Sequence, residues 1–508
     1  MNSRENPPLL PSSLVVGFAA SVAMWCGWYV LHLPGFAAGS KASALMLGLV
    51  LLMVTAFGGA QAHKPGHREG WVVGLIAGLI SAAINLLLLG SKVVEQPATT
   101  ADLEGLNNQL RPDAPVIVLG FFAFSAVVGA LGGFVGSALA RTRPRHESWL
   151  ATFSIVAAVS FLPLLVVGGI VTSTDSGMAV PDSVTTYGSL SFLFPLSLMA
   201  EPRIYFEHTH RLFGTLVGLT TLVLAVWVIG RSRAWGWLGL CIAMIGGLLL
   251  AFAARHADTL DQTPAILVMG SIVAIAFVLM IWGIVRAKSA QMAGLLVVLV
   301  VGQGLFGALR VSEISTPLAM AHGVLAQLVF GAAAALATLL NIQDRPVQAL
   351  PPEQTRRSIR SASRLGPWVV AALILQLILG AGYRHTASHA FLGGHVLFAV
   401  FVAALAIVIG SQLSTSERYS DVGQRSWRCG KALIHLVSLQ VVLGVVAVAL
   451  VAVAGAQRPI PLAHELEHAA PLPMMEAFFA TAHQATGAAL LALAVTIAVA
   501  SHLRSRQH

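Results

Sequence analysis

The sequence contains apolar runs that are about as long as the hydrocarbon core of a membrane is thick. A helix needs about 20 mostly apolar residues to cross that core. Fourteen such runs occur, at 13–33, 43–60, 71–90, 116–140, 150–171, 207–230, 236–254, 265–285, 290–309, 318–340, 367–383, 391–412, 432–455 and 474–502. They predict an all-α polytopic membrane protein with about 14 transmembrane helices.

The composition supports this fold class and excludes an ordinary soluble enzyme. Only 10% of the 508 residues are charged, whereas soluble domains carry about 25%. Hydrophobic residues make up 56%, and the 48 glycines suit helices that pack closely in lipid. The cysteines Cys26, Cys241 and Cys429 lie far apart, so neither a disulfide framework nor a cysteine-based zinc site is expected.

The distribution of basic residues predicts the orientation of the chain. If the N-terminus is cytoplasmic, the inside segments hold 21 of the 30 Lys and Arg residues, and the outside segments hold 8. This is the bias of the positive-inside rule, and it places both termini in the cytoplasm. The net charge of +9 is then explained by loops that face anionic lipid, with the bilayer as partner and no nucleic acid.

Four histidines lie inside or at the mouths of predicted helices that run from outside to inside: His210, His322, His395 and His483. Each follows the outer end of its helix by a few residues, which predicts a similar shallow depth. Their contexts also echo one another, since HRLF resembles HVLF and AHGVLAQ resembles AHQATGA. The pattern predicts two homologous four-helix halves.

A single histidine in an apolar helix is usually a satisfied core residue, but four at matched depth in repeated positions indicate ligands. Ionisable groups are expensive in lipid and tend to be functional. Neutral imidazole is a good ligand for iron, and its second nitrogen can make a hydrogen bond that fixes the tautomer. Two histidines in each half are therefore expected to hold one haem apiece.

Five motifs extend this pattern: VVGGIVTSTDSGMAVPD (166–182), EHTHRLFGTLVGL (207–219), GQGLFGALRV (302–311), AHGVLAQL (321–328) and AHQATGAALL (482–491). In this order they resemble the haem A synthase family, and the resemblance spans about 150–505. It implies a pair of four-helix bundles related by pseudo-twofold symmetry. It also implies an enzyme that oxidises a methyl group of haem O to the formyl group of haem A.

The resemblance assigns expected roles to individual residues. His210 and His322 would flank the substrate haem O, and His395 and His483 would be the axial ligands of iron in a resident haem B. Glu207 matches the acidic residue that the family carries beside the first histidine. The implied partners are a haem O synthase and terminal oxidase assembly factors, and the implied location is a bacterial inner membrane.

Glu207 and His210 are spaced i, i+3, so both side chains share one helical face. A carboxylate there would accept a proton from the substrate carbon or from an attacking water, or would stabilise positive charge on the ring periphery. The alternative is that Glu207 only begins the helix, where the helix dipole favours acids.

Three arginines are candidates for contacts with haem propionates. Arg310 and Arg384 lie at outer ends of spans, and a guanidinium suits a carboxylate, although snorkelling to the interface is an equal alternative. Arg211 is a further candidate, either for a propionate or for Glu207.

The chain departs from the family in three places. Some members carry a cysteine pair in the first outer loop, whereas residues 172–206 contain no cysteine. Four spans precede the resemblance, and a helix pair at 236–285 is inserted within it. We therefore expect an N-terminal four-helix extension (1–145), a substrate bundle (146–345) and a C-terminal haem B bundle (346–508).

Two other functions compete with this interpretation. Residues 464–468 read HELEH, and on a helix His464 and His468 would bind zinc with Glu465 as general base. Prolines flank the segment and no third ligand follows at a familiar spacing, which argues against a metalloprotease. A haem-binding electron-transfer or haem-transport protein would need the four histidines but not Glu207.

Overall fold

In the computed structural model, every long secondary-structure element is an α-helix. It describes residues 9–36, 38–62, 70–103, 108–140, 148–182, 184–255, 263–313, 315–344, 351–454 and 460–506. Within these ranges two isolated β-bridges occur and no β-strand forms.

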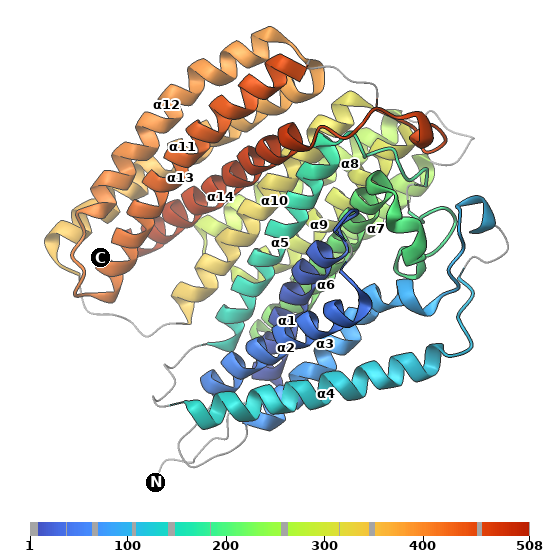
Figure 1. Cartoon of the computed structure of the whole chain (residues 1–508). Helices are drawn as coiled ribbons and strands as arrows, with labels where there is room; N and C mark the ends of the chain where they lie inside the picture. Colours follow the sequence, from blue (N-terminus) through green and yellow to red (C-terminus); the bar gives the residue numbers. More distant parts are fainter. Residues whose placement is uncertain are drawn as a thin grey trace. The chain divides into compact units, whose positions relative to one another are not determined.

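Fourteen helices in the described part are long and apolar enough to cross a membrane, which confirms the predicted all-α polytopic class. They are α1 (Leu9–Leu31), α2 (Ser40–Ala62), α3 (Gly70–Val93), α4 (Ala114–Leu139), α5 (Trp149–Ser173), α6 (Pro202–Ser232), α7 (Trp235–Arg255), α8 (Thr263–Val285), α9 (Ser289–Glu313), α10 (Thr316–Gln343), α11 (Glu353–Thr386), α12 (His389–Ser414), α13 (Asp421–Ala454) and α14 (Met474–Ser505) (Figure 1).

Two helices begin well before the apolar run that predicted them. Helix α11 starts at Glu353, although its apolar run starts near 367, and α13 starts at Asp421, although its run starts near 432. The added turns of α11 are polar, and Glu353 pairs with Arg356 and Arg357 at i, i+3 and i, i+4. Such pairs stabilise helix that extends beyond lipid, where apolar periodicity gives no signal.

The chain forms two compact units, which are described separately. The first contains residues up to 163 together with 176–220 and 461–467. The second contains 164–175, 221–460 and 468–508. The predicted three-part division stays a prediction, and its two boundaries, near 145 and 345, lie outside the described residues.

In the first unit, α3 and α4 cross along a seam of small residues. A Cβ atom added to Gly74 would lie 2.1 Å from the carbonyl oxygen of Gly129, and one added to Gly133 would lie 2.1 Å from that of Gly70. Such distances leave no room for a side chain. Spacing of small residues by four lets two helix backbones touch in a membrane, where packing replaces the hydrophobic effect.

In the second unit, α11 to α14 form a four-helix bundle. Within the bundle, each helix packs most extensively against two others, in the closed order α11, α12, α13, α14 and back to α11. The four helices run beside one another in Figure 1, coloured orange to red. Ala406, Leu433 and Leu490 are among the buried residues of its core.

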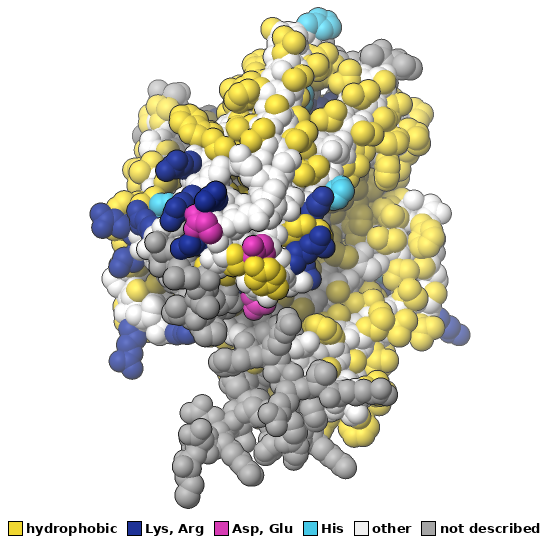
Figure 2. All heavy atoms as spheres, turned by 90° about the vertical axis from the view of Figure 1, so that its left-hand side faces the viewer, with side chains coloured by type: hydrophobic (Ala, Val, Ile, Leu, Met, Phe, Trp, Pro, Cys, Tyr) yellow, Lys and Arg dark blue, Asp and Glu magenta, His cyan; other side chains and the backbone are white. Residues whose placement is uncertain are grey.

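The outer faces of the helices carry large apolar side chains. Leu45, Leu250 and Leu397 are each about three-quarters exposed, and Figure 2 shows hydrophobic side chains over much of the face that it presents. In water, a protein with such an apolar surface would be prone to aggregation. The protein is therefore a multi-pass membrane protein whose apolar surface lies in lipid.

Candidate functional site

The four histidines lie at similar positions along their helices. His210 follows the first residue of α6 by eight positions, His483 follows that of α14 by nine, and His322 and His395 follow those of α10 and α12 by six. At about 1.5 Å of rise per residue, the spread is about 5 Å. All four histidines therefore lie in the second or third turn of their helices, and a matched depth in the membrane stays a prediction.

His395 and His483 face each other in the second unit. Their ring centres lie 6.1 Å apart and their planes are inclined by 74°. The two residues come from α12 and α14, which lie diagonally across the four-helix bundle. Of the histidine pairs that the sequence predicted, this one is brought together within a single unit.

Both rings are oriented by a main-chain carbonyl on the preceding helix. His395 Nδ1 donates to the carbonyl oxygen of Gln376 at 3.0 Å, and His483 Nδ1 donates to that of Gln440 at 3.1 Å. A neutral imidazole that donates through Nδ1 keeps an unprotonated Nε2. The two histidines therefore present their Nε2 lone pairs, the form in which histidine binds a metal.

A glycine one turn after each glutamine makes room for the ring. A Cβ atom on Gly380 would lie 2.9 Å from Cε1 of His395, and one on Gly444 would lie 2.9 Å from Cε1 of His483. Real Cβ atoms essentially never approach that closely. The imidazoles can occupy these positions only because no side chain stands there.

The same arrangement recurs around His322, on α10 of the second unit. Gln303 precedes it on α9, and a Cβ atom on Gly307 would lie 2.8 Å from Cε1 of His322. Here the glutamine side chain meets the ring: its Nε2 lies 3.0 Å from Nδ1 and 3.4 Å from Nε2 of His322, and it donates to the His322 carbonyl oxygen at 2.9 Å.

The glutamines were not singled out by the sequence analysis, although a signal for them exists. Each stands four residues before its glycine, in QGLFG (303–307), QLILG (376–380) and QVVLG (440–444). Residues four apart share a helical face, so a histidine on the next helix meets both. The repeat extends to the helices before the histidines, where GQGLFGALR echoes LQVVLGVVAVA, but no role was predicted for the glutamines within it.

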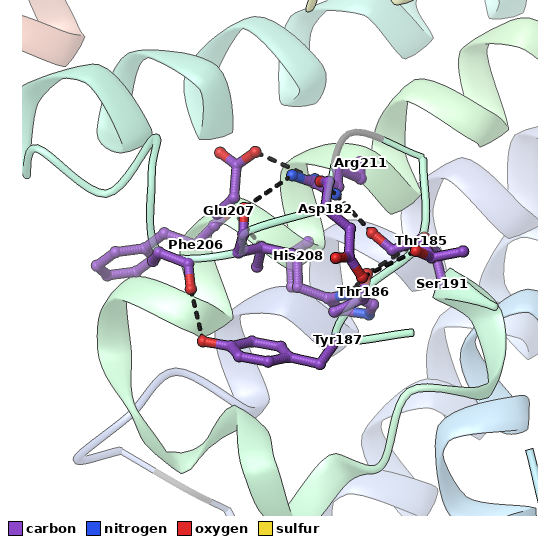
Figure 3. Close-up of polar contacts among 12 residues, drawn as sticks. Asp182, Thr185, Thr186, Tyr187, Ser191, Phe206, Glu207, His208 and Arg211 are labelled. Atoms are coloured by element: carbon purple, nitrogen blue, oxygen red, sulfur yellow. Dashed lines mark hydrogen bonds and ion pairs between the residues drawn. The ribbon is translucent and has the colours of Figure 1, made fainter. Parts of the chain in front are cut away.

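In the first unit, Glu207 is a buried member of an ion pair. Its Oε1 accepts from Nε of Arg211 at 3.1 Å, one turn along α6 (Figure 3). Glu207 lies in the second turn of α6. Glu201, which directly precedes the helix, caps its start, because its carboxylate accepts from the N–H of Ile204 at 2.7 Å. The helix-start role that was the alternative for Glu207 therefore belongs to Glu201.

Arg211 joins Glu207 to the loop that precedes α6. Its Nη1 donates to the carbonyl oxygens of Asp182 and Thr185, at 2.6 and 2.8 Å. Pairing with Glu207 was one of the two roles predicted for Arg211, and it is the one the contacts display. A propionate contact by Arg211 stays a prediction.

The same loop is held by two further residues that the sequence analysis did not identify. Tyr187 donates to the carbonyl oxygen of Ala179 at 2.8 Å, and burial together with nearby acids raises the pKa of Tyr187 to about 12. His208, fully buried on α6, lies 3.2 Å from Thr186 through Nδ1. His210 is half-buried on the same helix. Figure 3 shows the loop residues and His208 around the ion pair.

The two other predicted propionate contacts lie in the second unit. Arg384 donates to the carbonyl oxygen of Thr172 and pairs with Asp175 at 3.3 Å. His385 lies within electrostatic reach of both Arg384 and Arg310. The two arginines are thus gathered near one place, and their contact with a propionate stays a prediction.

The HELEH segment does not form an α-helix. Residues 464–468 adopt a turn followed by the short 3₁₀-helix Leu466–His468. Glu465 accepts from the N–H of Leu462, and its contact with His464 is long, at 3.9 Å. No group of three metal-ligating side chains forms among the described residues. The helical geometry that a zinc protease needs is missing here.

Comparisons with protein-family models, with characterised proteins and with solved structures found no match to this chain.

Proposed function

We propose that this membrane protein holds a haem B between His395 and His483 and oxidises the methyl group of haem O to the formyl group of haem A. The observation that carries the proposal is the pair of facing imidazoles in the α11–α14 bundle. Their Nδ1 atoms are engaged by carbonyls and their Nε2 atoms are unprotonated, that of His483 lying 3.2 Å from the side-chain nitrogen of Gln440.

The spacing of the two rings fits a six-coordinate iron. Two imidazole–metal bonds of about 2.0 to 2.1 Å, extended to the two ring centres, span about 6 Å. The ring centres lie 6.1 Å apart. The contacts of both Nδ1 atoms with carbonyls are those expected of ligating histidines. When bound, a bis-histidine haem B would supply a one-electron carrier.

The remaining roles follow the resemblance to the haem A synthase family. The substrate haem O is assigned to His210 and His322, and the propionates to Arg310 and Arg384. A haem O synthase and terminal oxidase assembly factors are the proposed partners. The proposed location is a bacterial inner membrane with both termini in the cytoplasm.

Glu207 is the proposed catalytic group. It is 5% exposed, shares α6 with His210, and has a counter-charge in Arg211. A carboxylate fixed in this way would take a proton from the reacting methyl carbon or from water, or oppose positive charge on the macrocycle. Arg211 fixes the carboxylate on one side and the loop carbonyls on the other, so it acts as a positioning residue.

The test has two parts, performed on protein purified from membranes that also make haem O. The first is haem extraction and mass analysis, which should yield haem B and some haem O or haem A. The second is the ratio of haem O, its hydroxylated intermediate and haem A in Glu207→Gln. Loss of a positioned base costs a factor of about 10² to 10⁴, so haem A formation should nearly stop while haem B is retained.

Glu201→Gln is the matched control, because Glu201 is also an acid on the outer side of α6 but serves the helix end. Its haem A yield should match that of the unmodified protein. Arg211→Lys keeps the counter-charge but loses the guanidinium fork, which separates a chemical role of Glu207 from a purely structural one. Normal haem A formation in Glu207→Gln, with haem B bound, would favour an electron-transfer or haem-transport protein. Protein without any haem would overturn the whole proposal.

A further inference from the structure

The N-terminal extension contacts the loop that joins α5 to α6, the loop whose carbonyl oxygens accept from Arg211. The segment that joins α3 to α4 folds back on itself at an isolated β-bridge between Val94 and Leu110, and it belongs to the same compact unit as the α5–α6 loop. Helix α3 also contacts the short 3₁₀-helix η2 (Ser191–Leu193) of that loop. Residues that precede the family resemblance therefore touch a loop on which the candidate site depends.

Two side chains of the α3–α4 segment accept hydrogen bonds from the main chain of the α5–α6 loop. Asn108 Oδ1 accepts from the N–H of Leu190 at 3.0 Å, and Gln96 Oε1 accepts from the N–H of Ser197 at 3.1 Å. The Ser197 hydroxyl donates back to the carbonyl oxygen of Pro97 at 2.7 Å. Gln96 is itself oriented, because its amide nitrogen donates to two carbonyl oxygens of its own segment. The loop is thus attached at two points along its length.

Gly90, near the end of α3, makes a third and closer contact with the loop. A Cβ atom added to Gly90 would lie 2.0 Å from the carbonyl oxygen of Phe192. That oxygen belongs to the backbone, so it cannot turn aside as the end of a side chain can. The helix and the loop can approach this closely only because residue 90 has no side chain.

A tight turn links these attachments to Arg211. Thr186 and Ser189 exchange both of their main-chain hydrogen bonds, at 2.9 and 3.0 Å, and so close the turn. The residue before the turn is Thr185, whose carbonyl oxygen accepts from Arg211 (Figure 3). The residue after it is Leu190, which Asn108 holds. Because the turn is closed by hydrogen bonds, fixing the chain after it also fixes the carbonyl before it.

We propose that the N-terminal extension positions Glu207, through the contacts of Gly90, Gln96 and Asn108 with the α5–α6 loop. The loop carbonyls orient Arg211, and Arg211 orients the Glu207 carboxylate. None of the three extension residues touches Glu207, so they are positioning residues. The inference rests on the proposed function, in which Glu207 acts on the substrate haem, and it gives the four added helices a part in that step.

The first experiment displaces the loop with a single methyl group. In Gly90→Ala, the loop must move away from α3 by about 1 Å, and a misplacement of that size can slow a catalysed step by about 10²-fold. Haem A formed per bound haem B should fall by at least about tenfold. Gly120→Ala is the matched control, because the Cβ position of Gly120 on α4 is open, and its haem A yield should be normal.

Haem B content and thermal unfolding in detergent should stay near those of the unmodified protein in both glycine variants. Normal haem A formation in Gly90→Ala would overturn the inference, because the loop would then have no influence on Glu207. A parallel loss of haem A, haem B and thermal stability would overturn it as well, since it would show a general structural role for the contact.

The second experiment needs no haem O and tests the attachment itself. Asn108 has a φ of 61°, a left-handed conformation that glycine adopts without strain, so Asn108→Gly removes the acceptor and keeps the backbone. Amide hydrogen exchange in the loop at 184–192 should become about fivefold faster, the effect of losing one hydrogen bond of typical net strength. Haem A formation should fall less than in Gly90→Ala.

Asn108→Asp keeps an acceptor oxygen and should restore both the slow exchange and haem A formation. Asp102→Ala is the matched control, because it removes hydrogen bonds to Thr99 that stay within the α3–α4 segment. Unchanged loop exchange in Asn108→Gly, or equally fast exchange in Asn108→Asp, would overturn the attachment. If Glu207→Gln forms haem A normally, the proposed function fails, whereas the exchange result still decides whether the extension holds the loop.

Discussion

Glycine serves two different purposes in the two units of this protein. Along the α3–α4 seam, a Cβ atom on Gly74 would meet a backbone oxygen at 2.1 Å. In α11, a Cβ atom on Gly380 would meet the end of an imidazole ring at 2.9 Å. At Gly74 the missing side chain lets two helix backbones touch, and at Gly380 it makes room for a functional group.

A glycine in a membrane helix therefore does not always mark a place where two helices pack closely. Backbone cannot move aside without moving the helix, whereas a histidine ring can turn about its own bonds. Substitution in the seam should therefore damage the fold of the first unit, and substitution beside a histidine should damage the site and spare the fold.

The largest effect is expected from removing a ligand itself. His483→Ala should deplete haem B from the purified protein, because the iron would lose one of the two protein ligands proposed to hold it. The low-spin absorption spectrum and extracted haem B per protein check this. Protein yield and detergent stability should stay near normal, and full haem B content would refute the ligand assignment.

Disrupting the α3–α4 seam should have the next largest effect, a loss of thermal stability. Gly74→Leu would force α3 and α4 apart, and overpacking costs at least about 1–3 kcal/mol. Thermal unfolding in detergent should shift downward for Gly74→Leu and little for Gly120→Leu, since Gly120 on α4 has no neighbour within 4 Å of its Cβ position. Equal shifts in the two variants would show that the close approach does not matter.

Adding a methyl group beside a ligand should have a smaller and more local effect. Gly380→Ala should push the ring of His395 and raise the rate of haem B loss by about tenfold. The control is Gly393→Ala, on α12 near His395, where the Cβ position is open. Haem transfer to a scavenging apoprotein measures both. Faster loss in both variants would point to a general weakening of the bundle.

The smallest effect is expected in the outer loop. His464→Ala should leave haem content, haem A formation and stability unchanged, because His464 is exposed and lies in a turn outside any helix. Assaying this variant beside His483→Ala compares two histidines of the same chain. An inactive His464→Ala would restore the HELEH segment as a candidate centre.

Much of the fold was predictable because lipid imposes a long apolar signal on each span. The number and class of the helices follow from that signal. The starts of α11 and α13 do not, since the first turns of both helices are polar; in α11 they are stabilised by ion pairs such as that of Arg357 with Glu353. Propensity and charge spacing decide such ends, and hydropathy carries no information on them.

The candidate site was predictable only in part. The histidines were visible because an ionisable residue is conspicuous in an apolar helix. Gln376 and Gln440 were assigned no role, because the contacts that orient Nδ1 of each ring come from their main-chain carbonyls, which every residue possesses. Glu207 and Arg211 pair because they are spaced i, i+4 on one helix. The sequence shows that spacing, but it does not favour this pair over other partners of either residue.

The connections between the helices bear on the order in which the parts of the site are made. Ala387, in the left-handed conformation, closes α11 within two residues of α12, so Gln376 and His395 belong to one tight hairpin that can insert as a unit. Gln440 and His483 are separated by 43 residues and an outer loop. During synthesis, one half of the histidine pair is therefore in place while the other is still to be translated. The haem B that we propose between them could be captured only after α14 has entered the membrane.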